Sequence, residues 1–391
     1  GAARDVRVTN EGDVTVIRVE DTRYALAFIA AEHFGRPASS LTTIGVTGTK
    51  GKTTTTYLIK HILEKAGHKV GLVGTIETII NDEHIPSKNT TPESFLLQQY
   101  FREMADAGID TVVMEVSSQA LKLHRTQGFI FDYGVFTNIS PDHIGDNEHK
   151  DFEEYMECKS RLFRQCITGI VNGDDGHLND ILKGHTCNVE TFGFNTDNDL
   201  RAENVKLVNG GNYLGVNFDV KGLMNFNTDA DFPGRFSVYN ALCAIAVCRH
   251  FNVSEDDIRS ALKTARVKGR IEMIHVSDEY TLMIDYAHNA MALESLLRTL
   301  REYEPGRIVC LFGCGGNRAK ARRFEMGEVS GKLSDFTIIT SDNPRFEEPQ
   351  TIMDDIETGI KKTSGRYIEI TDRKEAIAYA INHAKKGDVI V

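Results

Sequence analysis

The chain has 391 residues, more than one ordinary hydrophobic core holds, so two or three domains are expected. Its hydrophobic share of 41% and charged share of 26% are those of a globular protein. The net charge is −11 without a long basic run, so we expect no nucleic-acid partner. No apolar run approaches the roughly 20 residues of a membrane span, so we expect no membrane insertion. Seven scattered cysteines without paired spacing indicate reduced thiols, and we expect a cytoplasmic protein.

Residues 1–40 carry one strand pattern, at 14–19, and one helical pattern, at 21–31. One strand and one helix do not bury a core alone. We therefore expect this segment to be an appendage or part of a larger N-terminal domain.

From Leu41 onward, strand and helix patterns alternate, which predicts an α/β fold with a mostly parallel sheet covered on both faces. The expected strands of this central domain, residues 41–270, are 42–47, 70–73, 111–116 and 133–137, and the expected helices are 53–66, 91–104, 151–165 and 236–250. Polar, strand-rich residues 185–232 suggest a small antiparallel annex.

A second alternating unit, residues 271–391, is expected to be a Rossmann-like C-terminal domain that stops within a strand. Its expected strands are 281–284, 308–312, 336–340, 367–370 and 388–391, and its expected helices lie near 291–303, 323–333, 349–363 and 373–385.

A glycine-rich turn joins the first strand of the central domain to its first helix, which is the layout of a phosphate-binding loop. Backbone N–H groups of such a loop cradle phosphate oxygens, Lys52 would reach the β- and γ-phosphates, and the Thr53 hydroxyl would bind Mg2+. The general motif requires glycine at position 46, whereas this chain has Val46 and places the glycine at Gly45. The alternative is a plain surface turn. The expected nucleotide-binding loop comprises Gly48, Thr49, Lys50, Gly51, Lys52, Thr53 and Thr54.

Other polar residues follow predicted strands of the central domain. Glu115 lies at the end of a buried strand and is expected to be a second ligand of Mg2+. The alternative is a solvated residue at a strand end. His143 follows the strand 133–137 and is either a metal ligand or structural. Lys159 lies on the next helix, where the residue pattern alone favours a surface lysine.

Three comparable positions lie at the domain boundary and in the C-terminal domain. Arg270 and Asp285 either reach into an interdomain cleft or are a linker charge and a strand-end turn. A second glycine-rich turn follows the strand 308–312. Arg345 follows the strand 336–340, where a guanidinium can grip a carboxylate through two hydrogen bonds or simply be solvated.

Taken together, these motifs resemble those of the Mur ligase family, most closely the branch that adds the third residue of the peptidoglycan stem peptide. The motifs that carry the resemblance are residues 47–54, 89–92, 114–118, 137–143, 285–288, 312–316 and 342–345. The resemblance implies an ATP-dependent amide ligase. ATP phosphorylates the terminal carboxylate of UDP-MurNAc-L-Ala-D-Glu, and the amino group of meso-diaminopimelate attacks the acyl phosphate. Residues 1–40 are then part of a UDP-substrate domain.

The resemblance also assigns roles to single residues. It implies that the catalytic residues are Lys52, Glu115, His143 and Lys159. Thr53 and Glu115 serve a first Mg2+ and His143 a second, while Lys159 carries a carbamate derived from CO2 and so becomes an anion that can bridge toward the metal.

Nucleotide and substrate contacts follow in the same way. Those implied for ATP, beyond the loop, are Asn138, Asn240, Arg270 and Asp285. Those implied for the peptidyl nucleotide are Thr90, Thr91, Ser118 and Arg125. Those implied for the incoming amino acid are Arg323, Asp342, Asn343 and Arg345. Arg345 favours meso-diaminopimelate, because L-lysine lacks the distal carboxylate and ends in an ammonium that the guanidinium repels.

Several alternatives remain open. The chain could be the L-lysine-adding tripeptide synthetase, or a nucleotide-binding regulatory module without ligase activity. A folylpolyglutamate synthetase leaves residues 342–345 without a role, and a P-loop GTPase or transport ATPase is disfavoured by the displaced first glycine. We expect a monomer.

Overall fold

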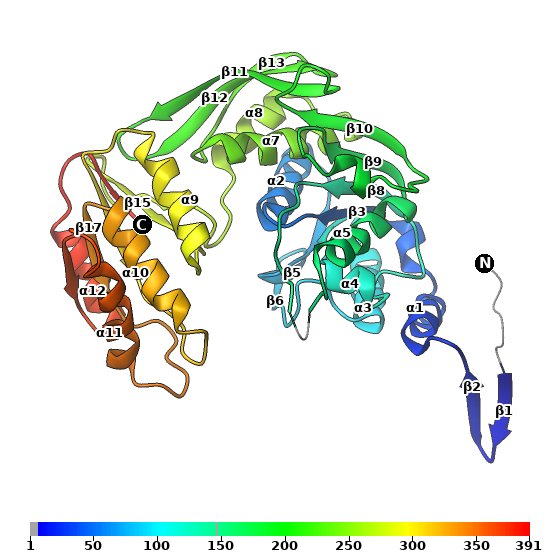
Figure 1. Ribbon diagram of the computed structural model, residues 1–391. Helices are drawn as coiled ribbons and strands as arrows, with labels where there is room; N and C mark the ends of the chain where they lie inside the picture. The colour runs from blue at the N-terminus through cyan, green and yellow to red at the C-terminus, as the bar shows by residue number, and fades with distance from the viewer. Residues whose placement is uncertain (1–6, 146–147) are drawn as a thin grey trace. The chain divides into compact units, whose positions relative to one another are not determined.

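The computed structural model describes residues 7–145 and 148–391 (Figure 1). They form two compact units. The first unit holds the described part of residues 1–203 together with 220–226 and 239–265, and the second holds 204–219, 227–238 and 266–391. Within the described residues, no helix is long and apolar enough to cross a bilayer.

The first unit begins with a hairpin of β1 (Arg7–Glu11) and β2 (Val14–Arg18), which pair antiparallel. Helix α1 (Thr22–His33) follows, and its N-cap Asp21 accepts hydrogen bonds from the N–H groups of Arg23 and Tyr24. The predicted strand and helix are both confirmed. Strand β1 was missed.

The centre of the first unit is a mostly parallel sheet, as predicted. Strands β4 (Val70–Val73), β7 (Thr111–Glu115), β3 (Thr42–Thr47), β8 (Phe131–Phe136), β9 (Cys166–Asn172) and β10 (Asn188–Gly193) lie next to one another in that order and are all parallel. At one edge, β5 (Glu77–Ile80) and β6 (Glu83–Pro86) add two antiparallel strands that were not predicted. Every residue of β7 is buried, as expected for a parallel strand covered on both faces.

Helices cover this sheet. Helix α2 (Lys52–Lys65) packs on β3, β4 and β7, and α8 (Glu255–Thr264) packs on α2. Helix α3 (Ser94–Asp106) buries Leu97, Phe101 and Met104 in the same core as Phe131 of β8. The remaining helices of four or more residues that fall wholly or partly in this unit are α4 (Ser118–Lys122), α5 (Phe152–Ser160), η1 (Pro37–Ser40), η2 (Arg161–Arg164), α6 (Leu178–Ile181) and α7 (Arg235–Cys248).

Residues 185–232 were expected to form a small antiparallel annex, but their strands continue the central sheet. Strand β10 pairs parallel with both β9 and β11 (Leu200–Asn209), and β12 (Leu214–Gly222) and β13 (Phe226–Ala230) follow in the same sheet. The physical reason is that the free edge of β9 presents unpaired N–H and C=O groups, which β10 satisfies. Such long-range pairing leaves no local signal in the sequence.

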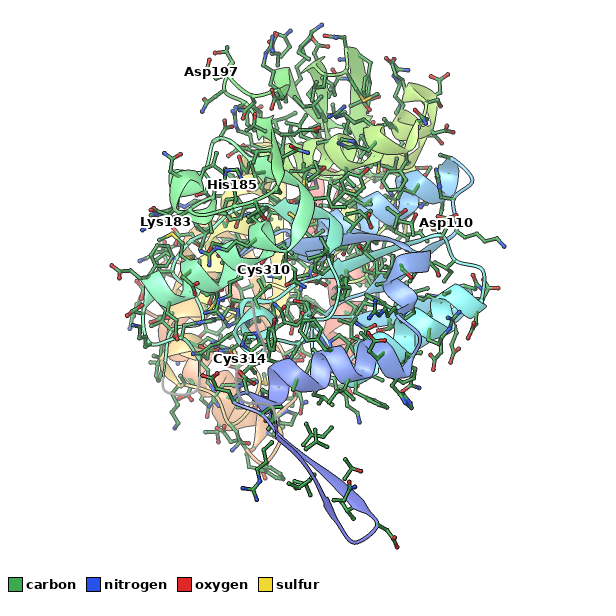
Figure 2. The ribbon with its side chains drawn as sticks, turned by 90° about the vertical axis from the view of Figure 1, so that its right-hand side faces the viewer. Asp110, Lys183, His185, Asp197, Cys310 and Cys314 are labelled. Atoms are coloured by element: carbon green, nitrogen blue, oxygen red, sulfur yellow. The ribbon has the colours of Figure 1, made fainter. Side chains whose placement is uncertain are left out.

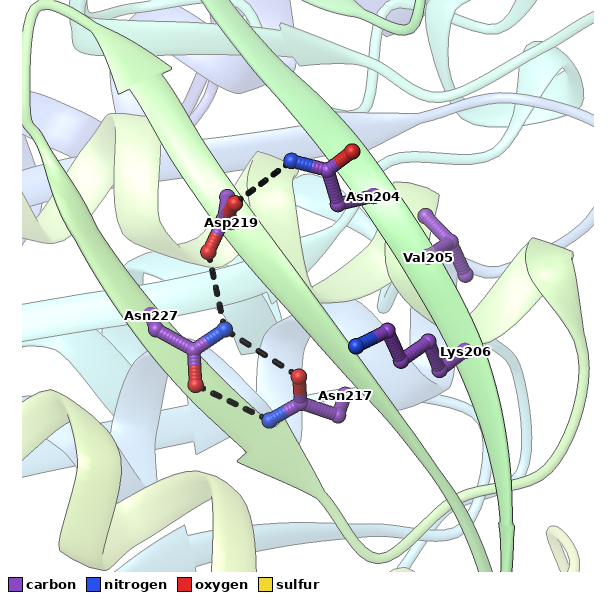
Figure 3. Close-up of a pocket in the computed structure, with 6 residues that line it drawn as sticks. All are labelled: Asn204, Val205, Lys206, Asn217, Asp219 and Asn227. Carbon is purple, nitrogen blue, oxygen red and sulfur yellow. Dashed lines mark hydrogen bonds between the residues drawn. The ribbon is translucent and has the colours of Figure 1, made fainter.

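A hollow of about 290 Å3 lies in the second unit over β11, β12 and β13 (Figure 3). Its polar side chains bond to one another across the strands: Asn217 and Asn227 exchange hydrogen bonds at 2.9 and 3.1 Å, and Asp219 accepts from Asn227 and Asn204, both at 2.8 Å. None of the predicted site residues lines this hollow. The ladder ties the three strands together.

The second unit is built on a sheet of six strands in the order β14-β15-β19-β16-β17-β18. Strands β15 (Thr281–Ile284), β19 (Asp388–Ile390), β16 (Arg307–Phe312), β17 (Phe336–Ile339) and β18 (Tyr367–Glu369) are parallel, and only β14 (Glu272–Ile274) runs against them. Its helices are α9 (Ala290–Arg301), α10 (Ala321–Leu333), α11 (Pro349–Ile360) and α12 (Arg373–Asn382). The predicted Rossmann-like alternation is confirmed, and only β14 was missed.

All seven cysteines are free and buried. Cys310 lies on β16 and Cys314 follows it (Figure 2), and burial raises the pKa of each thiol to about 11. These thiols are therefore held in the neutral, unreactive form at neutral pH.

Candidate functional site

The parallel sheet of the first unit brings four chain segments to one edge. Strands β4, β7, β3 and β8 are neighbours and parallel, so the residues that follow their carboxyl ends lie side by side. These segments are residues 74–75, 116–118, 48–51 and 137–138. Ligands of α/β proteins bind at this edge of the sheet.

The segment between β3 and α2 needs its glycines. Gly51 has φ of 85°, and a Cβ there would lie 2.5 Å from Oδ1 of Asn240. Gly48 has φ of 150°, and its Cβ would lie 2.0 Å from Oγ1 of Thr137. A side chain at either position would push the loop away from its neighbours, so the loop keeps its backbone open toward the site.

Asn138 holds this loop in place. The Lys50 N–H donates to Oδ1 of Asn138, and Nδ2 of Asn138 donates to the Lys50 carbonyl, both at 3.0 Å. Thr137 donates to the same carbonyl at 2.7 Å. The Lys52 ammonium donates to the carbonyls of Gly48 and Thr49 at 2.9 and 3.2 Å, so it lies across the mouth of the loop.

Behind the loop, Glu115 accepts hydrogen bonds from three donors. Its carboxylate is 1% exposed. The Thr53 hydroxyl lies 3.0 and 3.1 Å from its two oxygens, and Thr75 donates through its N–H at 2.8 Å and its hydroxyl at 3.1 Å. The structure therefore brings together the hydroxyl and the carboxylate that were both predicted to serve Mg2+. The alternative of a solvated strand end is wrong.

Lys159, on α5, is 1% exposed, so the alternative of a surface lysine is also wrong. Its Nζ donates to the Gly48 carbonyl at 2.9 Å and lies 4.5 Å from the centre of the Tyr155 ring. Burial, followed by the nearby cation of Lys52, lowers the pKa of Lys159 well below its ordinary value. Tyr155 also bonds through its hydroxyl to that of Thr49 at 3.1 Å, so α5 is tied directly to the loop.

His143 lies on the segment after β8, in a left-handed backbone conformation with φ of 54°. Its ring is half exposed, and Nδ1 lies 3.1 Å from Oε1 of Glu148. Among the described residues, no three His, Cys, Asp or Glu side chains gather as a metal site. Mg2+ is commonly held by one or two carboxylates together with phosphate oxygens and water, so a Mg2+ site does not require a cluster of three such side chains.

Three of the residues predicted to contact a peptidyl nucleotide, Thr90, Thr91 and Arg125, form a network beside Glu115, and Ser118 has a different partner. Thr91 donates to the Glu115 carbonyl at 2.9 Å and accepts from the Ser117 N–H at 3.0 Å. Arg125 donates to the Thr91 carbonyl at 3.1 Å. Thr90 and Thr75 bond through their hydroxyls at 3.1 Å. Ser118 bonds at 2.9 Å to Nε2 of His149, a histidine that is entirely buried.

The remaining predicted residues lie in the second unit, after the carboxyl ends of its parallel strands. Asp285 follows β15 and accepts from the N–H groups of Ile271 and Ala287 at 3.0 and 2.9 Å. The Arg270 guanidinium lies over the ring of Tyr286, 4.4 Å from its centre.

The segment after β17 holds the predicted amino-acid motif. Asp342, Asn343 and Arg345 are all exposed. Arg345 has φ of 53°, and its N–H donates to Oδ1 of Asn343 at 3.2 Å. Arg323 behaves differently: it is 1% exposed and its guanidinium pairs with Glu347 at 2.7 Å and Asp355 at 2.9 Å.

Among the residues of these networks that were not predicted as site residues are Thr75, His149, Tyr155 and Glu347. A signal existed for Tyr155, which lies four residues before Lys159 and so on the same helix face. A signal also existed for Thr75, which follows β4 at the shared sheet edge. The contacts of His149 and Glu347 depend on loop conformations that the residue pattern does not predict.

Family models match both units of the chain. The Mur ligase middle domain matches residues 46–248, and the Mur ligase, glutamate ligase domain, matches residues 269–391. The chain belongs to the Mur ligase family, which confirms the resemblance seen in the sequence.

Individual relatives are more specific. The chain is 44% identical over 381 residues to a UDP-N-acetylmuramoyl-L-alanyl-D-glutamate–2,6-diaminopimelate ligase from Caldanaerobacter subterraneus, covering 97% of this chain and 78% of the relative. It is 39% identical to the ligase of the same name from Bacillus cereus, covering 97% and 78%. A solved structure of that name matches with a TM-score of 0.73 and 27% identity, covering 95% of this chain and 77% of the other. A folylpolyglutamate synthase from Mycobacterium tuberculosis shares the fold, with a TM-score of 0.70 at 17% identity.

Proposed function

We propose that this chain is an ATP-dependent ligase that joins meso-diaminopimelate to UDP-MurNAc-L-Ala-D-Glu in peptidoglycan precursor synthesis. The names of relatives at 39–44% identity support the reaction. The structural observation that carries the proposal is the convergence on one loop of two amines and a buried hydroxyl–carboxylate pair. The residues involved are Lys52, Thr53, Glu115 and Lys159.

The loop fits the polyphosphate of ATP. The backbone of residues 48–53, at the N-terminus of α2, would bind phosphate oxygens, and Lys52 would leave the loop carbonyls to meet the β- and γ-phosphates. Thr53 and Glu115 would hold one Mg2+ and His143 a second. When bound, Mg2+ would offset the charge between the phosphates and the substrate carboxylate. Asn138, which is bonded to Lys50 of the loop, and Asn240, which lies beside Gly51, would contact the nucleotide as well.

Lys159 fits the proposed carbamate. An amine reacts with CO2 only when it is neutral, because the nitrogen lone pair forms the new N–C bond and the nitrogen then loses a proton. Burial favours this neutral form. The product is an anion beside the loop, which would attract a divalent metal where an ammonium would repel it.

The second unit would select the amino acid. Arg345 is exposed in a motif whose backbone is fixed by hydrogen bonds, and its guanidinium suits the distal carboxylate of meso-diaminopimelate. ATP would be contacted by Arg270 and Asp285. The peptidyl nucleotide would be contacted by Thr90, Thr91, Ser118 and Arg125.

We retain as part of this proposal the organisation into segments 1–40, 41–270 and 271–391, a cytoplasmic location and a monomeric state. Size-exclusion chromatography with light scattering tests the monomer.

The direct test is ATP-dependent phosphate release with UDP-MurNAc-L-Ala-D-Glu, comparing meso-diaminopimelate with L-lysine. We expect release with meso-diaminopimelate alone. Release with L-lysine instead would leave the ligase chemistry standing and overturn the argument from Arg345. Nucleotide binding without release for either amino acid would favour a regulatory module.

A further inference from the structure

Two loops of the second unit interlock at the carboxyl edge of its sheet. We call residues 313–320 the β16 loop and residues 340–348 the β17 loop. The Gly316 N–H donates to the Asn343 carbonyl at 2.8 Å, and the Phe346 N–H donates to Oδ1 of Asn317 at 3.3 Å. A Cβ on Gly316 would lie 1.9 Å from the Pro344 carbonyl oxygen, so only glycine allows this approach.

Glu347 closes this arrangement. One of its carboxylate oxygens accepts from the Asn317 N–H at 2.5 Å and from the Arg323 guanidinium at 2.7 Å. Arg323 in turn pairs with Asp355 of α11 at 2.9 Å. Hydrogen bonding to Arg323, then to the Asn317 N–H, lowers the pKa of Glu347 to about 2, so the carboxylate is ionised at every working pH.

We call the contacts of Glu347 with Asn317 and Arg323 the tether. The tether matters because the β17 loop holds Arg345 in a backbone conformation that costs free energy. Arg345 has φ of 53°, a left-handed value that a non-glycine residue keeps only when its surroundings enforce it. Its own N–H is bonded to Asn343 at 3.2 Å, on one side, and Glu347 lies two residues beyond it on the other. Phe346, between them, is 96% exposed and therefore adds little packing to hold the loop.

We infer that Glu347 is a positioning residue for amino-acid selection, which fixes the backbone that presents Arg345, and that Arg323 acts through Glu347. This inference rests on the proposed function. It assigns Arg323 a different task from direct contact with the amino acid, because two carboxylates already occupy the guanidinium of this buried side chain. Glu347, Arg323 and Asp355 form an anchor that joins the β17 loop to helices α10 and α11.

The test compares Glu347→Ala and Glu347→Gln with wild type. Alanine removes both acceptor contacts, so the KM for meso-diaminopimelate is expected to rise on the order of tenfold, with the KM values for ATP and for the peptidyl nucleotide unchanged. Glutamine keeps an acceptor oxygen at the same place and is expected to restore part of the loss. Glu328→Gln is the matched control, because Glu328 on α10 likewise pairs with a cation, that of Lys332, but lies outside both loops.

A coupling experiment separates positioning from general stability. If Glu347 acts through Arg345, then Glu347→Ala adds nothing to the KM for meso-diaminopimelate once Arg345→Ala is present. Effects that multiply in the double variant would overturn the inference, as would an equal rise in all three KM values.

A second readout does not need activity. Amide hydrogen exchange of residues 343–347 is expected to accelerate in Glu347→Ala while that of β17 stays slow. An inactive wild type with faster exchange in the variant would refute the proposed function and keep the tether. An active wild type with unchanged exchange and unchanged KM in the variant would refute the tether alone.

Discussion

The buried amine of Lys159 gives a sharp prediction about stability and pH. Its side chain is 1% exposed and its Nζ donates to the Gly48 carbonyl, and burial, followed by the cation of Lys52, lowers its pKa. In the unfolded chain the same amine has an ordinary pKa near 10.5. Folding therefore favours release of its proton.

The direction in which the free energy of unfolding changes with pH follows from the number of protons bound in the folded and unfolded states. The pKa is lowered in the folded protein, so between that lowered value and 10.5 the unfolded chain binds one more proton than the folded chain. The free energy of unfolding must then rise with pH in this interval, by about 1.4 kcal/mol per pH unit for one proton. Below the folded pKa the penalty of burying the charge is complete, and above 10.5 it has gone.

Lys159→Met removes the titrating group and keeps most of the volume. We expect the variant to be more stable than wild type near neutral pH, with the gap closing by up to about 1.4 kcal/mol per pH unit as the pH approaches the unfolded value. Urea titrations followed by circular dichroism, in buffers free of CO2, measure this. Lys361→Met is the control, because that lysine is exposed and Glu357 raises its pKa.

Bicarbonate extends the same experiment. Carbamate formation on the folded protein stabilises it by mass action, so added bicarbonate should raise the stability of wild type and leave Lys159→Met unchanged. Parallel stability curves for wild type and variant across the pH range would refute a neutral Lys159 in the folded protein. The carbamate argument would fall with it.

Three further predictions concern the loops. Gly51→Ala places a Cβ 2.5 Å from Asn240 Oδ1, so titration calorimetry should show nucleotide binding lost, and retained affinity would show that the loop has room. Glu115→Gln keeps the shape but weakens the partner of the Thr53 hydroxyl; we expect the Mg2+ concentration for half-maximal activity to rise by roughly tenfold or more, and an unchanged value would remove Glu115 from the metal site. Arg345→Lys removes the pair of hydrogen bonds that a guanidinium donates to one carboxylate, so the KM for meso-diaminopimelate should rise roughly tenfold while the KM for ATP stays constant. An equal rise in both KM values would refute selection by this residue.

The fold was largely predictable because its main elements carry local signals. The helix at 53–66 shows a clear apolar face, and the observed α2 spans Lys52–Lys65. The strands of the second unit are short apolar runs bounded by turns, and all five predicted ones are present. Strands β1, β5, β6, β9 and β14 were missed. Strands β6 and β14 carry no buried residue, and the pairing of all five depends on neighbours rather than on pattern.

The site was predictable in its motifs and not in its contacts. The spacing of residues in the sequence predicts the glycines of the phosphate-binding loop, the strand-end Glu115 and the loop residue Lys52. The burial of Lys159 does not, because a charged residue at a helix position is usually exposed. Tyr155, Cys158 and Lys159 do share one buried face of α5, at spacings of three and four residues. That periodicity places Lys159 on the buried face, and only its charge argued against burial.

The two units divide the proposed chemistry between them. The hydrogen bonds that shape the phosphate-binding loop involve residues between Gly48 and Lys159, with Asn240 packed against Gly51. Those that shape the β16 and β17 loops involve residues between Gly316 and Asp355. Each network lies in one compact unit and rests on the carboxyl edge of one parallel sheet. If the proposed assignments hold, substitutions in the β17 loop change the selection of the amino acid while the loop proposed to hold the phosphates keeps its geometry.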